Sequence, residues 1–354
     1  MRPIIAGTIL GFALGALLFV FVPRTTEFSL FERPGFRSEL LGELVSALRN
    51  RTASSTTLFF VGDIMLGRAV EARIERDGFS YPFVSTADLI SAHDLAIGNF
   101  EGVVTEVHTK APSMTFRFSI KDEYLKQLGD VGFDVLSNAN NHSLDYGVPA
   151  LVYMRSRCTA YSITCVGSPL NYRPYTTKVI VVDNKRIGLI ALHTLFVSPT
   201  DADIQSILAE LVHESDIQIA YVHWGEEYVL THNASQEHLA QTLIDNGVDV
   251  VVGHHPHVAQ DIALYNGKPI FYSLGNFVFD QFFSNDVQEM YGVSMTIDDD
   301  TIVSTVIPFS SKETHSRPVL MLEYDAVPFI KRLFSGIASS TDVQTDTRTI
   351  RSPY

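Results

Sequence analysis

The chain has 354 residues, a length that suits one large α/β domain or two smaller ones. With 46% hydrophobic and 19% charged residues, it has the composition of a globular protein and not of a disordered one. Its formal net charge of −14, without a clustered run of Lys and Arg, argues against a nucleic-acid partner. A phosphorylated or polyanionic substrate would need bound cations to reverse the local charge.

The N-terminal segment predicts a membrane span. No charged residue occurs between Arg2 and Arg24, and Ile4–Val22 is about the length that crosses a bilayer as a helix. No Ala-x-Ala-like cleavage site closes this run, so we expect an uncleaved signal anchor over residues 1–24. We expect a juxtamembrane linker over residues 25–55 and an extracytoplasmic domain after it, although the flanking charges give only a weak orientation signal.

From Leu58 onward, short apolar runs alternate with amphipathic stretches, which is the pattern of strands exchanging with helices. Several of the apolar runs end at polar side chains of the types that bind metals. These predicted strands are Leu58–Val61, Asp94–Ile97, Phe133–Leu136, Ile217–Val222 and Val248–Val252. Because the binding loops of α/β proteins gather at the carboxyl edge of a sheet, we expect these strand ends to meet along one sheet edge.

The other elements predict a mixed α/β fold over residues 56–310. Helices are expected at Ser38–Leu48, Lys121–Leu128, Val148–Arg157, Ile204–His213 and Ser235–Asn246, and hairpins within Lys178–Leu192, Asp261–Ser273 and Gly292–Ile307. Helices that alternate with strands early, followed by hairpins, predict a mixed sheet or two packed sheets. We expect a partly disordered tail over residues 311–354, because Thr341–Tyr354 has little to bury.

The two cysteines of the chain are Cys158 and Cys165. They are too few for a disulfide framework and lack the Cys-x-x-Cys spacing of a zinc knuckle. They could pair outside the cytoplasm, and the sequence leaves this pairing open.

Oxygen ligands follow the first two predicted strands. Asp63 comes after Gly62, while Asn99 and Glu101 lie two residues apart, and hence on one side of an extended backbone. Each could bind a cation through oxygen. Alternatively, Asp63 caps a helix and Glu101 is a structural hydrogen-bond acceptor.

Amide and imidazole groups follow the later strands. Asn141 and His142 come after the third strand, where an amide oxygen can coordinate a metal and the imidazole can act as ligand or proton donor. His223 follows the fourth strand, and His255 and His257 follow the fifth. A lone histidine at such a place is more often a core residue, but the whole set contains nitrogen and oxygen ligands without thiolates. It suits a catalytic site for Mn²⁺, Fe, Zn²⁺ or Mg²⁺, where two ions about 3.5–4 Å apart can activate a water.

A series of motifs follows in order between about Leu58 and Gln281. They are Gly62–Arg68, Gly98–Glu101, Asn140–Gly147, His223–Tyr228, Gly253–His257 and Tyr272–Phe277. The series resembles the capsule-synthesis CapA (PgsA-type) family. This resemblance implies a calcineurin-like metallophosphatase fold with two packed mixed β-sheets flanked by helices. It also implies a membrane-tethered bacterial protein that takes part in making or exporting poly-γ-glutamate.

The resemblance also implies roles for residues that match the family's motifs. The implied metal ligands are Asp63, Asn141, His223, His255 and His257. His142 matches the histidine that protonates the leaving group, and His254 stands where the motif has glycine, so its role is open. Metallophosphatases have a histidine ligand where this chain has Met65, and a bridging aspartate where it offers only Asn99 and Glu101. We assign Glu101 to the metal; a site short of two ligands holds one ion or a different ion, or binds weakly.

Further side chains are predicted to contact the substrate: Asn99, Glu226, Tyr228, Ser273 and Asn276. A turn after the hairpin explains Ser273 and Asn276 equally well, and solvation explains Glu226 nearly as well. The sequence therefore favours a membrane-anchored capsule or poly-γ-glutamate biosynthesis protein that hydrolyses a phosphoester or an amide with a divalent metal. The alternative is a non-catalytic accessory subunit that binds the anionic polymer, its precursor, or a membrane synthase or export partner.

Overall fold

The computed structural model describes residues 36–51, 55–110, 116–171, 173–337, 343–344 and 349–354. The predicted anchor over residues 1–24 lies outside the described residues. Among the helices that are described, none is both long enough and apolar enough to cross a bilayer. Within the predicted linker, α1 (Phe36–Arg49) buries Val45 and Leu48 against the folded domain.

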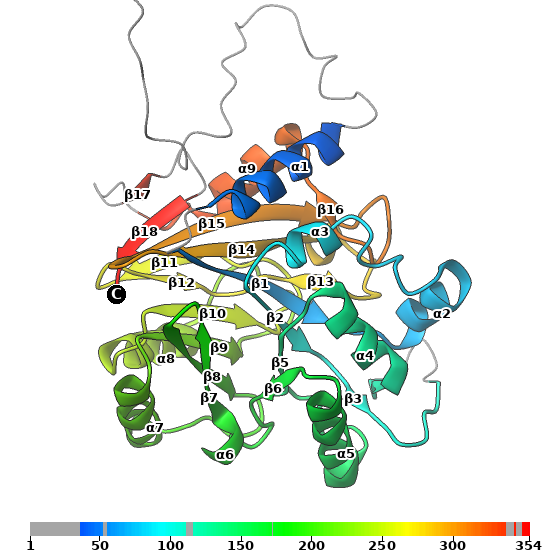
Figure 1. Cartoon of the computed structure of the whole chain (residues 1–354), viewed down its shortest axis with the longest axis horizontal. Coiled ribbons are helices and arrows are strands. Elements are labelled where there is room, and N and C mark those ends of the chain that lie inside the picture. Colours follow the sequence, from blue (N-terminus) through cyan, green and yellow to red (C-terminus); the bar gives the residue numbers. More distant parts are fainter. Residues whose placement is uncertain (1–35, 52–54, 111–115, 172, 338–342, 345–348) are drawn as a thin grey trace, which may run out of the picture.

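Two β-sheets lie next to each other, with helices on their outer faces (Figure 1). In spatial order, the first sheet contains β17 (Val343–Gln344), β18 (Thr349–Pro353), β15 (Thr301–Ser310), β14 (Glu289–Ile297), β1 (Thr56–Ile64), β2 (Leu95–Phe100), β5 (Val135–Ser137) and β6 (Thr164–Val166). Two short strands complete this sheet, because β13 (Asn276–Val278) pairs with β1 and β16 (Val319–Leu320) pairs with β15. The second contains β11 (Ile262–Tyr265), β12 (Lys268–Phe271), β10 (Val250–His254), β9 (Ile217–His223), β8 (Lys185–His193) and β7 (Thr177–Val182). A small separate ladder joins β3 (Val103–Val104) to β4 (Ser119–Ile120).

The helices divide between the two sheets. Those packed with the first sheet are α2 (Arg68–Asp77), α3 (Ala87–Ile90), α4 (Asp122–Val131) and α5 (Gly147–Ala160), and those packed with the second are α6 (Arg173–Thr176), α7 (Asp201–Glu214) and α8 (Ala234–Asp245). The 3₁₀ turn η1 (Asp286–Gln288) precedes β14, and α9 (Glu323–Leu333) packs on β15. The predicted architecture of two mixed sheets flanked by helices is confirmed.

Strand β1 shows why the two sheets pack together. Every residue of this strand is buried. Phe59 and Val61 belong to the apolar cluster under the helices, whereas Leu58 and Phe60 belong to the cluster between the sheets. Successive side chains of a strand point to opposite faces, so a continuous apolar run requires cover on both sides.

Local sequence signals account for many of the boundaries. Capping boxes start α7, through Thr200 and Asp203, and α8, through Asn233 and Gln236. The three predicted hairpins are present as β7–β8, β11–β12 and β14–β15. Asn266 and Gly267 turn the second of them with positive φ angles of 50° and 76°, as a two-residue hairpin turn requires.

The strand ends do not lie along one sheet edge, which corrects the sequence prediction. Strands β1, β2 and β5 belong to the first sheet, whereas β9 and β10 belong to the second. Continuous apolar runs in the sequence identify buried strands, but they do not show which sheet each strand joins. The side chains of the types that bind metals therefore meet where the carboxyl ends of strands from the two sheets face each other.

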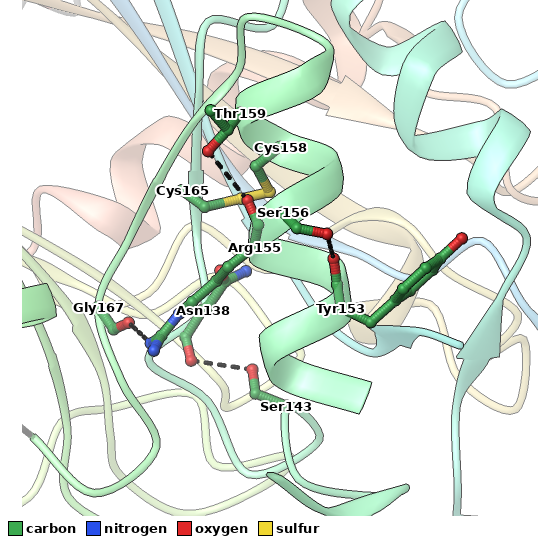
Figure 2. The surroundings of a disulfide bond; sticks show 9 residues. All are labelled: Asn138, Ser143, Tyr153, Arg155, Ser156, Cys158, Thr159, Cys165 and Gly167. Carbon is green, nitrogen blue, oxygen red and sulfur yellow. Dashed lines mark hydrogen bonds between the residues drawn. A yellow bond between two sulfur atoms is a disulfide. The ribbon is translucent and has the colours of Figure 1, made fainter. Parts of the chain in front are cut away.

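Two further segments gain definition from the structure. Within residues 311–354, Phe329 and Leu333 of α9 are buried, and Ile350 of β18 is buried beside β15, so part of this tail belongs to the fold. The domain boundaries themselves stay predictions. Cys158 and Cys165 form a disulfide that joins the end of α5 to β6 (Figure 2).

Candidate metal centre

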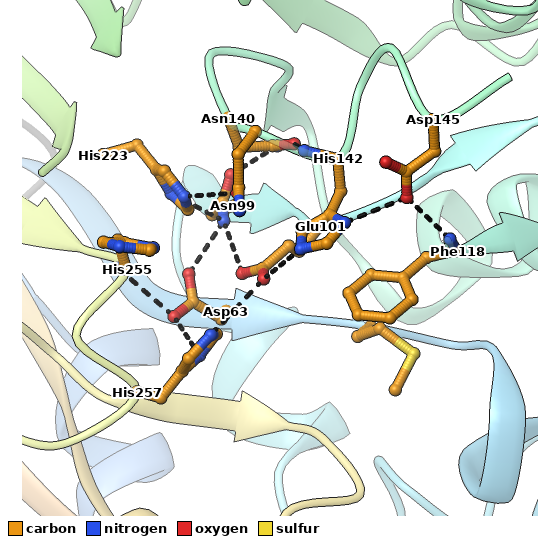
Figure 3. Close-up of polar contacts among 12 residues, drawn as sticks. Asp63, Asn99, Glu101, Phe118, Asn140, His142, Asp145, His223, His255 and His257 are labelled. Atoms are coloured by element: carbon orange, nitrogen blue, oxygen red, sulfur yellow. Dashed lines mark hydrogen bonds and ion pairs between the residues drawn. The ribbon is translucent and has the colours of Figure 1, made fainter. Parts of the chain in front are cut away.

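The candidate site begins with Asp63, the carboxylate near the end of β1. It is fully buried, and its Oδ1 accepts a hydrogen bond from Asn99 Nδ2 at 2.7 Å. Its Oδ2 accepts one from the backbone nitrogen of His255 at 3.3 Å and lies 3.3 Å from His257 Nδ1. Asp63 thus contacts groups that come from both sheets (Figure 3).

Glu101, which follows β2, is the second buried carboxylate. Its Oε1 has no hydrogen-bond partner among the described residues, although His257 Nε2 lies 3.6 Å away and His142 Nε2 3.7 Å away. Asn99 lies between the two carboxylates, donating from Nδ2 to Asp63 and, at 3.3 Å, to Glu101, while its Oδ1 accepts from Asn140 at 2.9 Å. Asn99 therefore holds the carboxylates in place and uses both ends of its amide to do so.

His142 is fixed by a carboxylate and an aromatic ring. Its Nδ1 lies 2.9 Å from Asp145 Oδ2, and that oxygen also accepts from the backbone nitrogen of Phe118 at 2.7 Å. The Phe118 ring stacks on the imidazole with centroids 3.9 Å apart. A carboxylate only accepts, so Nδ1 carries the proton and Nε2 faces Glu101.

His223 and His254 lie on neighbouring strands in direct register. Their Nδ1 atoms are 2.7 Å apart, and His254 Nδ1 lies 3.5 Å from Asp63 Oδ1. The other ring nitrogen of His223 lies 2.9 Å from Asn141 Oδ1. Asn141 and His223, which are 82 residues apart in sequence, thus meet across the boundary between the sheets.

Three groups of side chains each bring ligand atoms within 4.8 Å of one another, which is close enough to hold a cation. They are Asp63, His223 and His254; Asp63, Glu101 and His257; and Glu227, His255 and His257. Buried atoms without a hydrogen-bond partner among the described residues include Glu101 Oε1, His255 Nδ1 and His254 Nε2. Buried polar atoms are normally satisfied, so unsatisfied donors and acceptors at one place fit a bound ion. The His and Asp clusters are therefore compatible with a divalent metal.

The electrostatics support the same conclusion. Burial would raise the pKa of Asp63, but His254 and His257 together hold that pKa below its ordinary value. Burial, followed by the charge of Asp63, raises the pKa of Glu101 well above its ordinary value. Burial also lowers the pKa of His255 to about 3. The centre consequently presents an ionised carboxylate and a neutral imidazole, which are the forms that bind metal.

The predicted substrate residues lie in different places. Tyr228 is exposed at the edge of the centre, where its ring faces His257 with centroids 6.0 Å apart. Asn276 Oδ1 accepts from His257 Nδ1 at 2.8 Å, so Asn276 orients a candidate ligand. Ser273 is buried, and its hydroxyl accepts a hydrogen bond from the backbone nitrogen of Gly275 in the same turn. Glu226 is exposed, whereas its neighbour Glu227 belongs to one of the three groups that could hold a cation.

The sequence does not predict the roles of several residues of the centre. The sequence leaves the role of His254 open and gives none to Asn140 or Asp145. The spacing of Asp145 three residues after His142 is a usable signal, because one turn brings the two side chains together. Met65 stands where a histidine ligand is expected, and its sulfur accepts from the backbone nitrogen of Gly67 at 3.1 Å.

Comparison with known proteins places the chain in a family. The bacterial capsule synthesis protein family PGA_cap matches residues 57–281. The chain belongs to this family. The PGA biosynthesis protein CapA of Bacillus subtilis (strain 168) is 35% identical over 238 residues, which are 63% of this chain and 63% of that protein. The capsule biosynthesis protein CapA of Bacillus anthracis is 30% identical over 298 residues, covering 78% of this chain and 72% of that relative.

This member of the PGA_cap family is also similar to solved structures. A hypothetical protein from Thermus thermophilus is 16% identical, with a TM-score of 0.47 and coverage of 75% of this chain and 97% of that chain. A phosphatase from Mycoplasma pneumoniae is 15% identical, with a TM-score of 0.46 and coverage of 69% of this chain and 88% of that chain.

Proposed function

We propose that the chain is a metal-dependent hydrolase of the metallophosphatase type that acts on a phosphoester or an amide in capsule or poly-γ-glutamate biosynthesis. The observation that carries this proposal is the convergence of Asp63, Glu101, His255 and His257 beside the oriented His142. The family of the chain and the names of its relatives supply the pathway. The substrate belongs to the anionic polymer or its precursor, and the domain is extracytoplasmic, tethered by the predicted N-terminal span.

The residues divide the chemistry among themselves. Asp63, Glu101, His223, His254, His255 and His257 would hold the cation, with Asn141 as an oxygen donor. A divalent cation supplies Lewis acidity toward a phosphoryl or acyl oxygen when it is bound. The Nε2 of His142 faces the centre and delivers a proton to the leaving group, while Asp145 stabilises the positive charge of the protonated ring.

One observation favours a second candidate function, that of a non-catalytic accessory subunit. The Met65 sulfur contacts Gly67 of its own turn, so the first motif offers Asp63 without the expected histidine. In this second case the centre recognises the polymer or a synthase or export partner and turns nothing over.

The test uses the full chain with bis(4-nitrophenyl) phosphate and added Mn²⁺. We expect bound metal and turnover in the unchanged protein, loss of both in His255→Ala, and retained metal with turnover about 100-fold lower in His142→Ala. His238→Ala, which removes an exposed histidine of α8, is the control and should change neither. A metal-free protein that still binds poly-γ-glutamate would establish the accessory function instead.

A further inference from the structure

Arg68 belongs to the first sequence motif, yet the proposed function gives it no part. Its guanidinium donates a hydrogen bond to Oδ1 of Asp280, a residue 212 positions away. The other oxygen of Asp280 accepts from the backbone nitrogen of Ala69 at 3.1 Å. The two side chains are only 8% and 3% exposed, so solvent screens the pair much less than it screens an ion pair on the surface. Asp280 therefore fixes the guanidinium and the first turn of α2 together.

The start of α2 depends on this distant carboxylate. Gly67, the residue before the helix, has no side chain to cap it, and a carboxylate at a helix N-terminus interacts favourably with the backbone N–H groups there. Arg68 itself has a φ of 51°, which is uncommon for a residue with a side chain. The surrounding contacts thus hold Arg68 in one particular conformation.

The guanidinium contacts two phenyl rings, and each ring contacts a histidine of the metal centre. Arg68 Cζ lies 4.6 Å from the centroid of Phe118 and 5.6 Å from that of Phe279, within the range of cation–π attraction. Phe118 stacks on His142 with centroids 3.9 Å apart, and Phe279 lies 4.8 Å from His257. The two phenyl rings meet edge to face at 6.0 Å.

We propose that Arg68 and Asp280 are a positioning pair that sets the orientation of His142 through Phe118 and of His257 through Phe279. The planar guanidinium suits this place because it can stack on a ring while it donates in its own plane to a carboxylate, which an ammonium cannot do. Arg68 acts through the rings, so it is a positioning residue. The assignment of chemistry to His142 and His257 rests on the proposed function, but the geometry of the pair does not.

The test compares Arg68→Lys with Arg73→Lys in the full chain. Arg73 is a matched control, because it lies on the same helix, pairs with Asp77 and stacks over Tyr81 at 4.5 Å. With ¹³C-labelled histidine, we expect Arg68→Lys to shift the ring signals of His142 and His257, since the ring currents of Phe118 and Phe279 act on them. Arg73→Lys should leave both signals in place.

Two variants of the phenyl rings test the contact with His142 and the contact with His257 separately. They also replace Arg68→Lys if that protein does not fold. Phe118→Leu should shift the His142 signal and leave His257, and Phe279→Leu should do the reverse. Unchanged histidine signals in Arg68→Lys, or shifts of both signals in each ring variant, would overturn the proposal.

Turnover provides the second readout. We expect Arg68→Lys to lower kcat about tenfold or more while KM changes little, because misplaced catalytic groups lose rate more than binding. A change confined to KM would contradict a positioning role. If the unchanged protein has no turnover, the proposed function fails, and the histidine signals still decide the role of Arg68.

Discussion

The two halves of the metal centre differ in the chemistry that each sheet supplies. The first sheet, through the ends of β1, β2 and β5, provides the oxygen atoms of Asp63, Glu101 and Asn141. The second sheet, through β9 and β10, provides imidazoles, with His223 and His254 in register. In the first half the pKa of Asp63 is held below its ordinary value, whereas burial lowers the pKa of His223 in the second half well below its ordinary value.

Two of the three groups of potential ligands combine side chains from both sheets, whereas Glu227, His255 and His257 all follow strands of the second sheet. Each group of potential ligands that contains Asp63 also contains a histidine from the second sheet or the loop after it. A cation that bridges the halves satisfies the carboxylates and the imidazoles together. Packing of the two sheets is therefore a condition for any cation site that includes Asp63, and variants in each half can test it.

The strongest loss is expected from variants that remove one ligand from each half. Asp63→Asn and His255→Gln should each weaken Mn²⁺ binding more than about 100-fold, because loss of a direct ligand exceeds the usual effect of an outer contact. Isothermal titration of the full chain measures this. If one variant binds Mn²⁺ as tightly as the unchanged protein, the corresponding half does not contribute.

Acid is expected to lower the free energy of unfolding through His93, a histidine that lies away from the metal centre and contacts the first sheet. Burial lowers the pKa of His93 to about 4, and its ring bonds to Leu89 O and Ser294 Oγ, both at 2.8 Å. Between the ordinary pKa of 6.5 and about 4, the unfolded chain binds a proton that the folded chain does not. As the pH falls from about 6.5 to 4, the free energy of unfolding should therefore decrease, and His93 should account for about 3 kcal/mol of this decrease.

Urea unfolding at several pH values measures this contribution. His93→Gln should flatten the dependence between pH 6.5 and 4 relative to the unchanged protein. An identical slope in the two proteins would show that other groups cause the acid effect.

The disulfide stabilises an element of the same half. Cys158→Ser with Cys165→Ser opens the short loop between α5 and β6 and should cost about 2 kcal/mol of the free energy of unfolding. Thermal unfolding in the presence and absence of reductant checks this value, with Mn²⁺ affinity as the control. Equal stability of the reduced and oxidised proteins would contradict it.

A weaker effect is expected at a hydrogen bond that joins the halves. Tyr221 of β9 is buried, and its hydroxyl donates to the backbone oxygen of Val61 in β1. Tyr221→Phe should lower the free energy of unfolding by about 1 kcal/mol and leave the ligands in place. A much larger loss, accompanied by loss of Mn²⁺ binding, would mean that this contact sets the alignment of the sheets.

The sequence predicts the contents of the centre better than its architecture. The placement of Asp63, Glu101 and His223 after apolar runs reveals the ligand types, because polar side chains at strand ends are visible in a linear pattern. Sheet membership is not visible, because strands buried on both faces look alike. The pairing of Arg68 with Asp280 also escapes detection, since no periodicity connects residues 212 positions apart. Ile350 joins β18 although its neighbours are polar, so composition alone predicts disorder there.

Whether ligands from two sheets share a cation can be decided by an anomalous-scattering map of crystals soaked in Mn²⁺. We predict a peak bonded both to carboxylate oxygen of Asp63 and to an imidazole nitrogen of His223, His254, His255 or His257. A peak that contacts side chains of one sheet alone, or ordered protein at saturating Mn²⁺ without a peak between the sheets, would show that the two halves hold no common ion.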